Sequence, residues 1–237
     1  MTVQADGART LWRDLANAPG GFDQSLVVVE SVDHRSSPDG WVSVVTLEGA
    51  TVIATPPGQL RQVHDLIEAV GPERLADHAY VASLAHPART LGPARLFYDG
   101  TPQRTSSVAV VGPLSITDSH VARVLDDASA EERAETDLED ATSGIYVALD
   151  ANQTPAAICG WRRVPHDVAH IGVLCARSKR GTGAALRASN QALRAAAADG
   201  LLAQWRAAEQ NASSIQLARA LGLSELGSQL SLEFSTV

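Results

Sequence analysis

The chain has 237 residues, 45% of them hydrophobic and 4% aromatic, and carries a formal net charge of −8. This length allows one large domain or two small ones, with enough apolar residues to form a core without metals or disulfides. The two cysteines, Cys159 and Cys175, exclude a disulfide framework and a multi-cysteine zinc site, so we expect no bound metal and a reducing, cytoplasmic compartment. Short apolar runs and a charged N-terminus favour neither a membrane span nor a secretory leader. The acidic total disfavours nucleic acid as a partner.

The first hundred residues combine valine-rich segments with helical patterns. Val63, Leu66 and Val70 recur at helical spacing, and Gly71-Pro72 ends that helix. In chain order we predict a helix at 8–16, strands at 24–32, 40–47 and 50–55, helices at 59–70 and within 72–84, and a strand at 93–98. Residues 99–107 contain proline and serine and are the best linker candidate, which places a domain boundary between residues 106 and 107.

After the linker the pattern restarts. We predict a strand at 108–111, a polar helical region at 118–138, and a hairpin of strands 144–149 and 155–162 with a longer loop. We then predict a strand at 168–175, a helix at 183–198, a strand at 201–206, a helix at 212–221, and two final strands at 223–226 and 229–234. Strands and helices are thus mixed along both halves. This pattern predicts an α/β (mixed α+β) protein with a domain at 1–106 and a second at 107–237.

Charge is spread unevenly along the chain. Carboxylates crowd residues 126–140, where only Arg133 opposes them, whereas Arg and Lys dominate residues 172–206, where only Asp199 opposes them. A local basic stretch in an acidic protein indicates either an anion site or a solvated face. The acidic run is explained by a solvated helix face, and equally by a surface that attracts cationic amines.

The segment 169–186 carries the most chemical information. It combines a strand, a short basic turn, Gly181 and Gly183, and an amphipathic helix. The glycines let the backbone approach a ligand closely, and the unpaired amides at the start of the helix attract an anion. The segment has neither the further glycine of a dinucleotide-binding fingerprint nor the Gly-Lys-Ser/Thr of a Walker A loop.

The run Arg180-Gly181-Thr182-Gly183-Ala184-Ala185 resembles the Gln/Arg-x-x-Gly-x-Gly/Ala signature of the GNAT superfamily of acyl-CoA-dependent N-acyltransferases. The resemblance extends over about 107–237 and includes Asn211-x-x-Ser214. It also includes Leu221-Gly222-Leu223, where leucine replaces the family's usual phenylalanine. It implies a central mixed, mostly antiparallel sheet flanked by helices, which binds acyl-CoA and follows an α+β N-terminal domain of unassigned role.

The resemblance also implies roles for individual residues. Backbone amides of the glycine turn would hold the pyrophosphate, basic side chains would favour the nucleotide phosphates, and main-chain groups at the end of the strand would pair with the pantetheine arm. The far side of the arm would contact one asparagine and one serine. The implied cofactor-binding residues are Leu174, Cys175, Ala176, Arg177, Lys179, Arg180, Gly181, Thr182, Gly183, Ala184, Ala185, Asn211 and Ser214.

The catalytic groups are less clearly indicated. Ala218 stands where many family members have a tyrosine acid, and His170 stands near their strand carboxylate. His170 is the first candidate base, because its intrinsic pKa suits that role, although a packing histidine fits as well. Glu209 is the next candidate base, and His166, in the loop before the strand at 168–175, is the third. A water chain is a further route for the proton. Cys175 could offer its amide as an oxyanion donor, or its thiol as a nucleophile without assignable partners.

These observations lead to two functional hypotheses. The first is an N-acetyltransferase that moves acetyl from acetyl-CoA directly to a primary amine of a small molecule or peptide. The second is a non-catalytic CoA- or acyl-CoA-binding sensor, motivated by Ala218 and the absent strand carboxylate. A structural protein whose glycine turn is only a tight connection is a weaker third. Residues 1–106 would act as a lid for the acceptor site, as a dimerisation element of a homodimer, or as a second acyltransferase-like half without its glycine turn.

Overall fold

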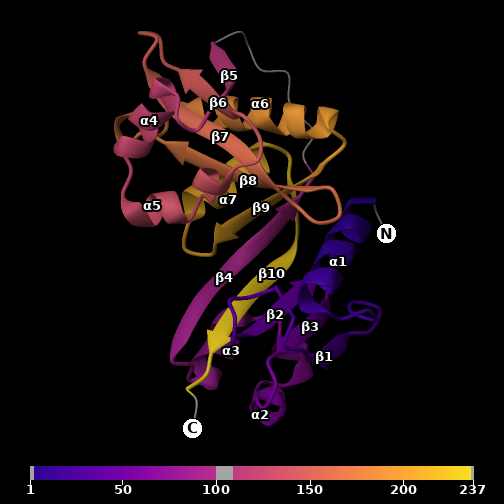
Figure 1. The fold of residues 1–237 in the computed structure, drawn as a ribbon. Coiled ribbons are helices and arrows are strands. Elements are labelled where there is room, and N and C mark those ends of the chain that lie inside the picture. The colour runs from indigo at the N-terminus through magenta and orange to yellow at the C-terminus, as the bar shows by residue number, and fades with distance from the viewer. Residues whose placement is uncertain (1–2, 100–108, 236–237) are drawn as a thin grey trace. The chain divides into compact units, whose positions relative to one another are not determined.

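The computed structural model describes residues 3–99 and 109–235, and the chain forms two compact units (Figure 1). The first unit comprises residues 1–96, 207–212 and 225–237, and the second comprises residues 97–206 and 213–224. The expected linker at 99–107 lies, apart from Asp99, outside the described residues, as does Val108 of the strand expected at 108–111. The domain boundary between residues 106 and 107 therefore stays a prediction.

The first unit is built on a sheet with the strand order β1-β3-β2-β10-β4. β1 pairs with β3 in parallel, whereas β2 is antiparallel to both β3 and β10. One sheet face packs against α2 through a cluster that includes Val42, Ile53, Val63 and Leu230. The elements are α1 (Val3–Ala16), β1 (Leu26–Glu30), β2 (Val42–Leu47), β3 (Ala50–Thr55), α2 (Leu60–Val70), a 3-10 turn (Pro72–Arg74), α3 (His78–Ala85), β4 (Arg89–Tyr98) and β10 (Ser224–Glu233).

The two final strands expected at 223–226 and 229–234 are wrong, because the structure forms one continuous strand, β10. Gly227, at the interruption of the apolar pattern, pairs with Leu47 of β2. A Cβ atom at Gly227 would collide with the backbone carbonyl of Thr46. The glycine therefore permits a close approach between two strands and does not mark a turn.

The second unit is built on a sheet with the strand order β9-β8-β7-β6-β5, in which only β8 and β9 run parallel. The polar region expected at 118–138 is divided between α4 and α5, which begins after the N-cap Ser129. The elements are β5 (Val110–Leu114), α4 (Ser119–Asp126), α5 (Ala130–Ala134), a 3-10 turn (Leu138–Asp140), β6 (Ile145–Leu149), β7 (Pro155–Val164), β8 (Val168–Cys175), a 3-10 turn (Arg177–Lys179), α6 (Ala184–Ala198), β9 (Leu202–Ala208) and α7 (Ala212–Ala220).

Helices cover both faces of the second sheet. Ile158 of β7 packs with Val121 and Val124 of α4, while the neighbouring Cys159 meets Ser189 of α6. Because successive strand residues point to opposite faces, α4 and α6 lie on opposite sides. The predicted fold class, a mixed and mostly antiparallel sheet flanked by helices, is confirmed. In the described part of the chain, no helix is long and apolar enough to cross a membrane.

Candidate functional site

The glycine turn between β8 and α6 has the geometry of an anion cradle. Gly181 and Gly183 adopt left-handed φ values of 75° and 76°. No described atom lies within 4 Å of where a Cβ of Gly181 would stand, and a Cβ of Gly183 would approach only an Arg187 nitrogen, at 3.7 Å. Gly183 is the N-cap of α6 and supplies no side-chain hydrogen bond to the first amides of the helix. Space, amide donors and the positive end of the helix dipole therefore coincide here, and this arrangement fits a phosphate group.

Strand β8 parts from its neighbour β9 before it reaches this turn. Their pairing runs from Val168 to His170, which lies opposite Gln204, whereas β8 continues to Cys175. On its other side β8 stays paired with β7, as far as Cys175 opposite Ala157. One edge of the last five residues of β8 thus has no strand partner among the described residues. An extended ligand arm can bind along such an edge as an added strand does.

The register shows which amides face that edge. The amide of Ala176 donates to the carbonyl of Ala156 across the β7 ladder, at 2.9 Å. Hydrogen-bonded and non-hydrogen-bonded pairs alternate along antiparallel strands, so the main-chain N–H and C=O groups of Leu174 also point toward β7. The main-chain N–H and C=O groups of Val173 and Cys175 point the other way, toward the unpaired edge of β8. Of the three residues expected to pair with the arm, only Cys175 directs its main chain there, and Val173 was missed.

Carboxylates from other parts of the second unit form hydrogen bonds and ion pairs with the basic side chains of the turn. Glu132 of α5 accepts hydrogen bonds from Arg177 at 3.4 Å and from Arg180 at 2.5 Å. Lys179 forms an ion pair with Asp150, at 2.7 Å. A backbone hydrogen bond from Ser129, followed by the contact with Arg180, lowers the pKa of Glu132 to about 2. The contact with Lys179 is the largest cause that lowers the pKa of Asp150 to about 2.

The Cys175 thiol lies against the start of α6. Its sulfur donates to the carbonyl of Ala156, at 3.4 Å, and interacts with the backbone amide of Ala185. Burial raises the pKa of this thiol, so the protonated form is favoured. The thiol thus lies among packing contacts, whereas the amide of the same residue faces the open edge of the strand.

His170 lies at the point where β8 and β9 part, and its side chain is only 7% exposed. Its Nδ1 is 3.1 Å from Oε1 of Gln204, whose Nε2 donates to the Tyr98 hydroxyl at 2.7 Å. This series of hydrogen bonds assigns the proton of the neutral His170 ring to Nδ1, so that Nε2 carries the lone pair. Nε2 lies 3.5 Å from Asp137 Oδ2. Burial, followed by the charge of Arg206, lowers the pKa of His170 to about 4. The ring is therefore a neutral hydrogen-bond acceptor at physiological pH.

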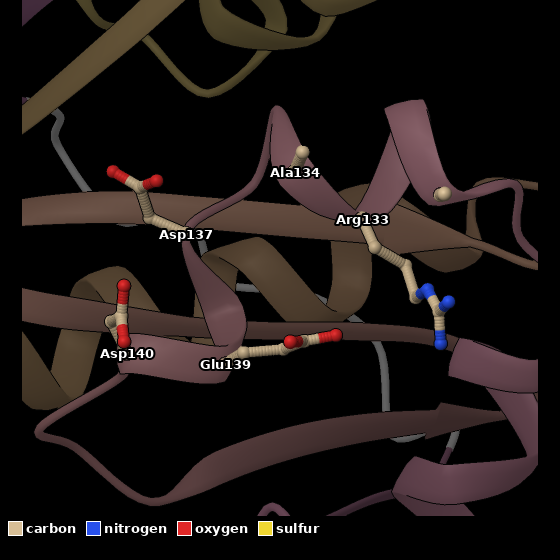
Figure 2. Close-up of a pocket in the computed structure, with 6 residues that line it drawn as sticks. Arg133, Ala134, Asp137, Glu139 and Asp140 are labelled. Atoms are coloured by element: carbon tan, nitrogen blue, oxygen red, sulfur yellow. The ribbon is translucent and has the colours of Figure 1, made fainter.

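Asp137, which contacts this histidine, also lines a hollow of about 310 Å³. Figure 2 shows the carboxylates of Asp137, Glu139 and Asp140, together with Arg133, around it. Asp137 accepts a further contact from Arg162, at 3.3 Å. The hollow is rich in carboxylates, so it suits a cationic group better than an anionic one.

Three predicted residues make contacts of another kind. Glu209 and Asn211 belong to the first unit, where the Glu209 carboxylate pairs with Arg95 at 3.1 Å. Ser214 belongs to the second unit and accepts a hydrogen bond from the indole of Trp205, at 2.9 Å. Trp205 is 1% exposed, and it serves as a core residue. The ligand contacts expected of Glu209, Asn211 and Ser214 stay predictions.

Residues of the candidate site that sequence reasoning did not assign are Asp127, Glu132, Asp137, Val173 and Gln204. The first three lie in the acidic run, whose composition indicates a negative charge but does not indicate which residues pair with it. Gln204 carries no sequence signal beyond its place in a predicted strand.

Comparison with known proteins gives structural likenesses only. No family model matches the chain, and no curated protein matches it. Many solved structures that resemble it are GNAT-family acetyltransferases. One, an acetyltransferase of the GNAT family from Colwellia psychrerythraea, is 15% identical, with 77% of this chain and 75% of that chain covered and a TM-score of 0.48. A GCN5-related N-acetyltransferase from Kribbella flavida is 18% identical, with 83% and 69% covered and a TM-score of 0.47. Another from Sphaerobacter thermophilus is 13% identical, with 77% and 70% covered and a TM-score of 0.47.

Proposed function

We propose that the protein transfers acetyl from acetyl-CoA directly to a primary amine of a small molecule or peptide. The observation that carries this proposal is the continuous path along β8, from its unpaired edge at Val173 and Cys175 to the open glycine turn at Gly181 and Gly183. An extended arm that ends in a pyrophosphate matches that path in chemistry and in order. Acetyl-CoA has this arrangement, as the resemblance at residues 180–185 implies.

The cofactor site combines backbone amides with positive side chains. The amides from Gly181 to Ala185 would hold the pyrophosphate, although the Ala185 amide also interacts with the Cys175 sulfur. Arg177, Lys179 and Arg180 would hold the nucleotide phosphates. When bound, acetyl-CoA supplies an acyl group already activated as a thioester. The Cys175 amide, directed at the open edge, is placed to donate to the carbonyl oxygen as negative charge develops there.

The acceptor amine would lie near His170 and Asp137. The Nε2 lone pair of His170 accepts a hydrogen bond from the amine and so orients the nitrogen, while the Asp137 carboxylate attracts its cationic form. Because the pKa of His170 is about 4, this ring orients the amine better than it retains a proton. Water therefore carries the proton away. Glu209 remains the second candidate base.

The phosphate cradle is tested by calorimetric titration with acetyl-CoA, comparing wild type with Gly183→Asp. The new carboxylate stands where the pyrophosphate belongs, so we expect binding to be lost. Because Gly183 has a φ of 76°, a side chain there is strained, so the control variant must carry the same strain. Gly200→Asp is the matched control, because Gly200 follows the other end of α6 with a φ of 73° and has open space around it. Unchanged affinity in Gly183→Asp would refute the cradle assignment.

Catalysis is tested separately, by the release of free CoA thiol over a panel of primary amines. Turnover that depends on the amine supports acetyl transfer. Tight binding of acetyl-CoA without turnover across wide panels would contradict it and would favour a non-catalytic sensor.

A further inference from the structure

We propose that Glu132 is a built-in competitor for the phosphates of CoA, holding the two arginines of the glycine turn until the cofactor displaces it. This inference rests on the proposed function, because it concerns the affinity of the same site. Binding would then exchange internal ion pairs for pairs with the ligand, and Glu132 would set the affinity for CoA.

The geometry shows one carboxylate shared between two cations. Glu132 Oε1 accepts from an Arg180 nitrogen at 2.5 Å, and Oε2 accepts from an Arg177 nitrogen at 3.4 Å. Asp127 Oδ2 accepts from the backbone amide of Arg177, at 2.6 Å. Carboxylate oxygens thus make, on the same turn, the charged contacts that phosphate oxygens make with arginines and amides.

The position of Glu132 does not depend on the arginines. Glu132 is the third residue of a capping box, in which its backbone amide donates to Ser129 Oγ at 3.2 Å. The Ser129 amide donates in return to Glu132 Oε2, at 2.9 Å. The start of α5 therefore holds the carboxylate in place, and the two flexible arginines come to it.

The Glu132 carboxylate also stays ionised at physiological pH. The Ser129 amide, together with Arg180 and Arg177, lowers its pKa to about 2. Protonation therefore cannot release the arginines at physiological pH. A ligand releases them only by offering more negative charge, and the phosphates of CoA offer it.

The test is calorimetric titration with CoA itself, so that no turnover is required, for wild type, Glu132→Gln and Glu131→Gln. Glutamine retains the capping box but loses the charge. Ion pairs at a protein surface each change an equilibrium constant roughly 1.4- to 5-fold, so releasing two should tighten CoA binding roughly 2- to 30-fold in Glu132→Gln. Glu131→Gln removes the same charge from the neighbouring exposed residue and should change affinity less, because within the described chain Arg177 and Arg180 pair with Glu132.

Salt dependence provides a readout that a merely structural role would not move. In wild type the number of ion pairs is nearly conserved on binding, so affinity should fall only gently as salt rises. In Glu132→Gln binding creates new ion pairs, so affinity should fall more steeply. Arg180→Gln should remove most of the gain, because the arginine that Glu132 restrains is then absent.

The outcomes separate the two proposals. CoA binding by wild type with no gain, or with weaker binding, in Glu132→Gln overturns the competitor role and leaves the proposed function standing. Equal gains in Glu131→Gln, or an undiminished gain in the Arg180→Gln background, overturn it too, because general charge would then be the cause. Failure of wild type and of Glu132→Gln alike to bind CoA overturns the proposed function as well. Binding by the variant alone supports both.

Discussion

Acidification should destabilise the second unit through His170, and the substitution His170→Gln should remove that part of the acid sensitivity. The imidazole is buried, and burial followed by the charge of Arg206 lowers its pKa to about 4, against 6.5 in the unfolded chain. Between these two values the unfolded chain binds a proton that the folded protein does not. The contribution of the uncharged His170 to the free energy of unfolding is therefore present above pH 6.5 and is lost as the pH falls toward 4.

The size of the effect follows from the two pKa values. Between pH 7 and pH 5, a group that titrates at 6.5 when unfolded and at about 4 when folded removes about 2 kcal/mol from the free energy of unfolding. This interval avoids interference from Glu132 and Asp150, whose pKa values are about 2, so both stay ionised throughout. His78 in the first unit, whose pKa burial also lowers to about 4, adds a contribution of its own.

The assay is urea unfolding at pH 7, 6 and 5, for wild type and for His170→Gln. The variant should lose about 2 kcal/mol less than wild type over this range, whatever its stability at pH 7. His64→Gln, on an exposed position of α2, controls for the loss of a histidine side chain. Parallel pH dependence of wild type and His170→Gln would refute the reasoning, because His170 would then titrate alike in the folded and unfolded chains.

Two further substitutions test the packing around the site. Gly172→Ala places a methyl group against the backbone carbonyl of Thr136 and should cost about 1–3 kcal/mol in urea unfolding, whereas Gly20→Ala, where no described atom lies within 4 Å, should be nearly neutral. Ser214→Ala leaves the buried indole N–H of Trp205 without its acceptor and should cost about 1–3 kcal/mol. That cost should largely disappear in a Trp205→Phe background, and a cost of the same size there would contradict the assignment.

Much of the fold could be predicted because its signals are local. The strands expected at 50–55 and 168–175 coincide with β3 and β8, where apolar, valine-containing runs are bounded by turn residues. The helix expected at 183–198 begins one residue later, at Ala184, and ends as predicted at Ala198. Backbone preferences over a few residues suffice for such elements.

The continuity of β10 could not be predicted, because it depends on a partner that is distant in the chain. Gly227 resembles a break until β2 lies beside it, and then it is the residue that lets the two backbones meet. The division of the acidic run is similar. Its composition predicts a polar helical region, but the course of residues 136–137 depends on Gly172 leaving room above β8.

By itself, the sequence was enough to locate the glycine turn at Gly181 and Gly183, which we propose binds phosphate, since positive φ values and a helix start are properties of a few consecutive residues. Only the tertiary structure decided what meets that turn. Glu132 lies 48 residues before Arg180, and Asp137 lies 33 residues before His170, so no local pattern pairs them. An ion pair depends on distance in space, and the folded topology alone sets that distance.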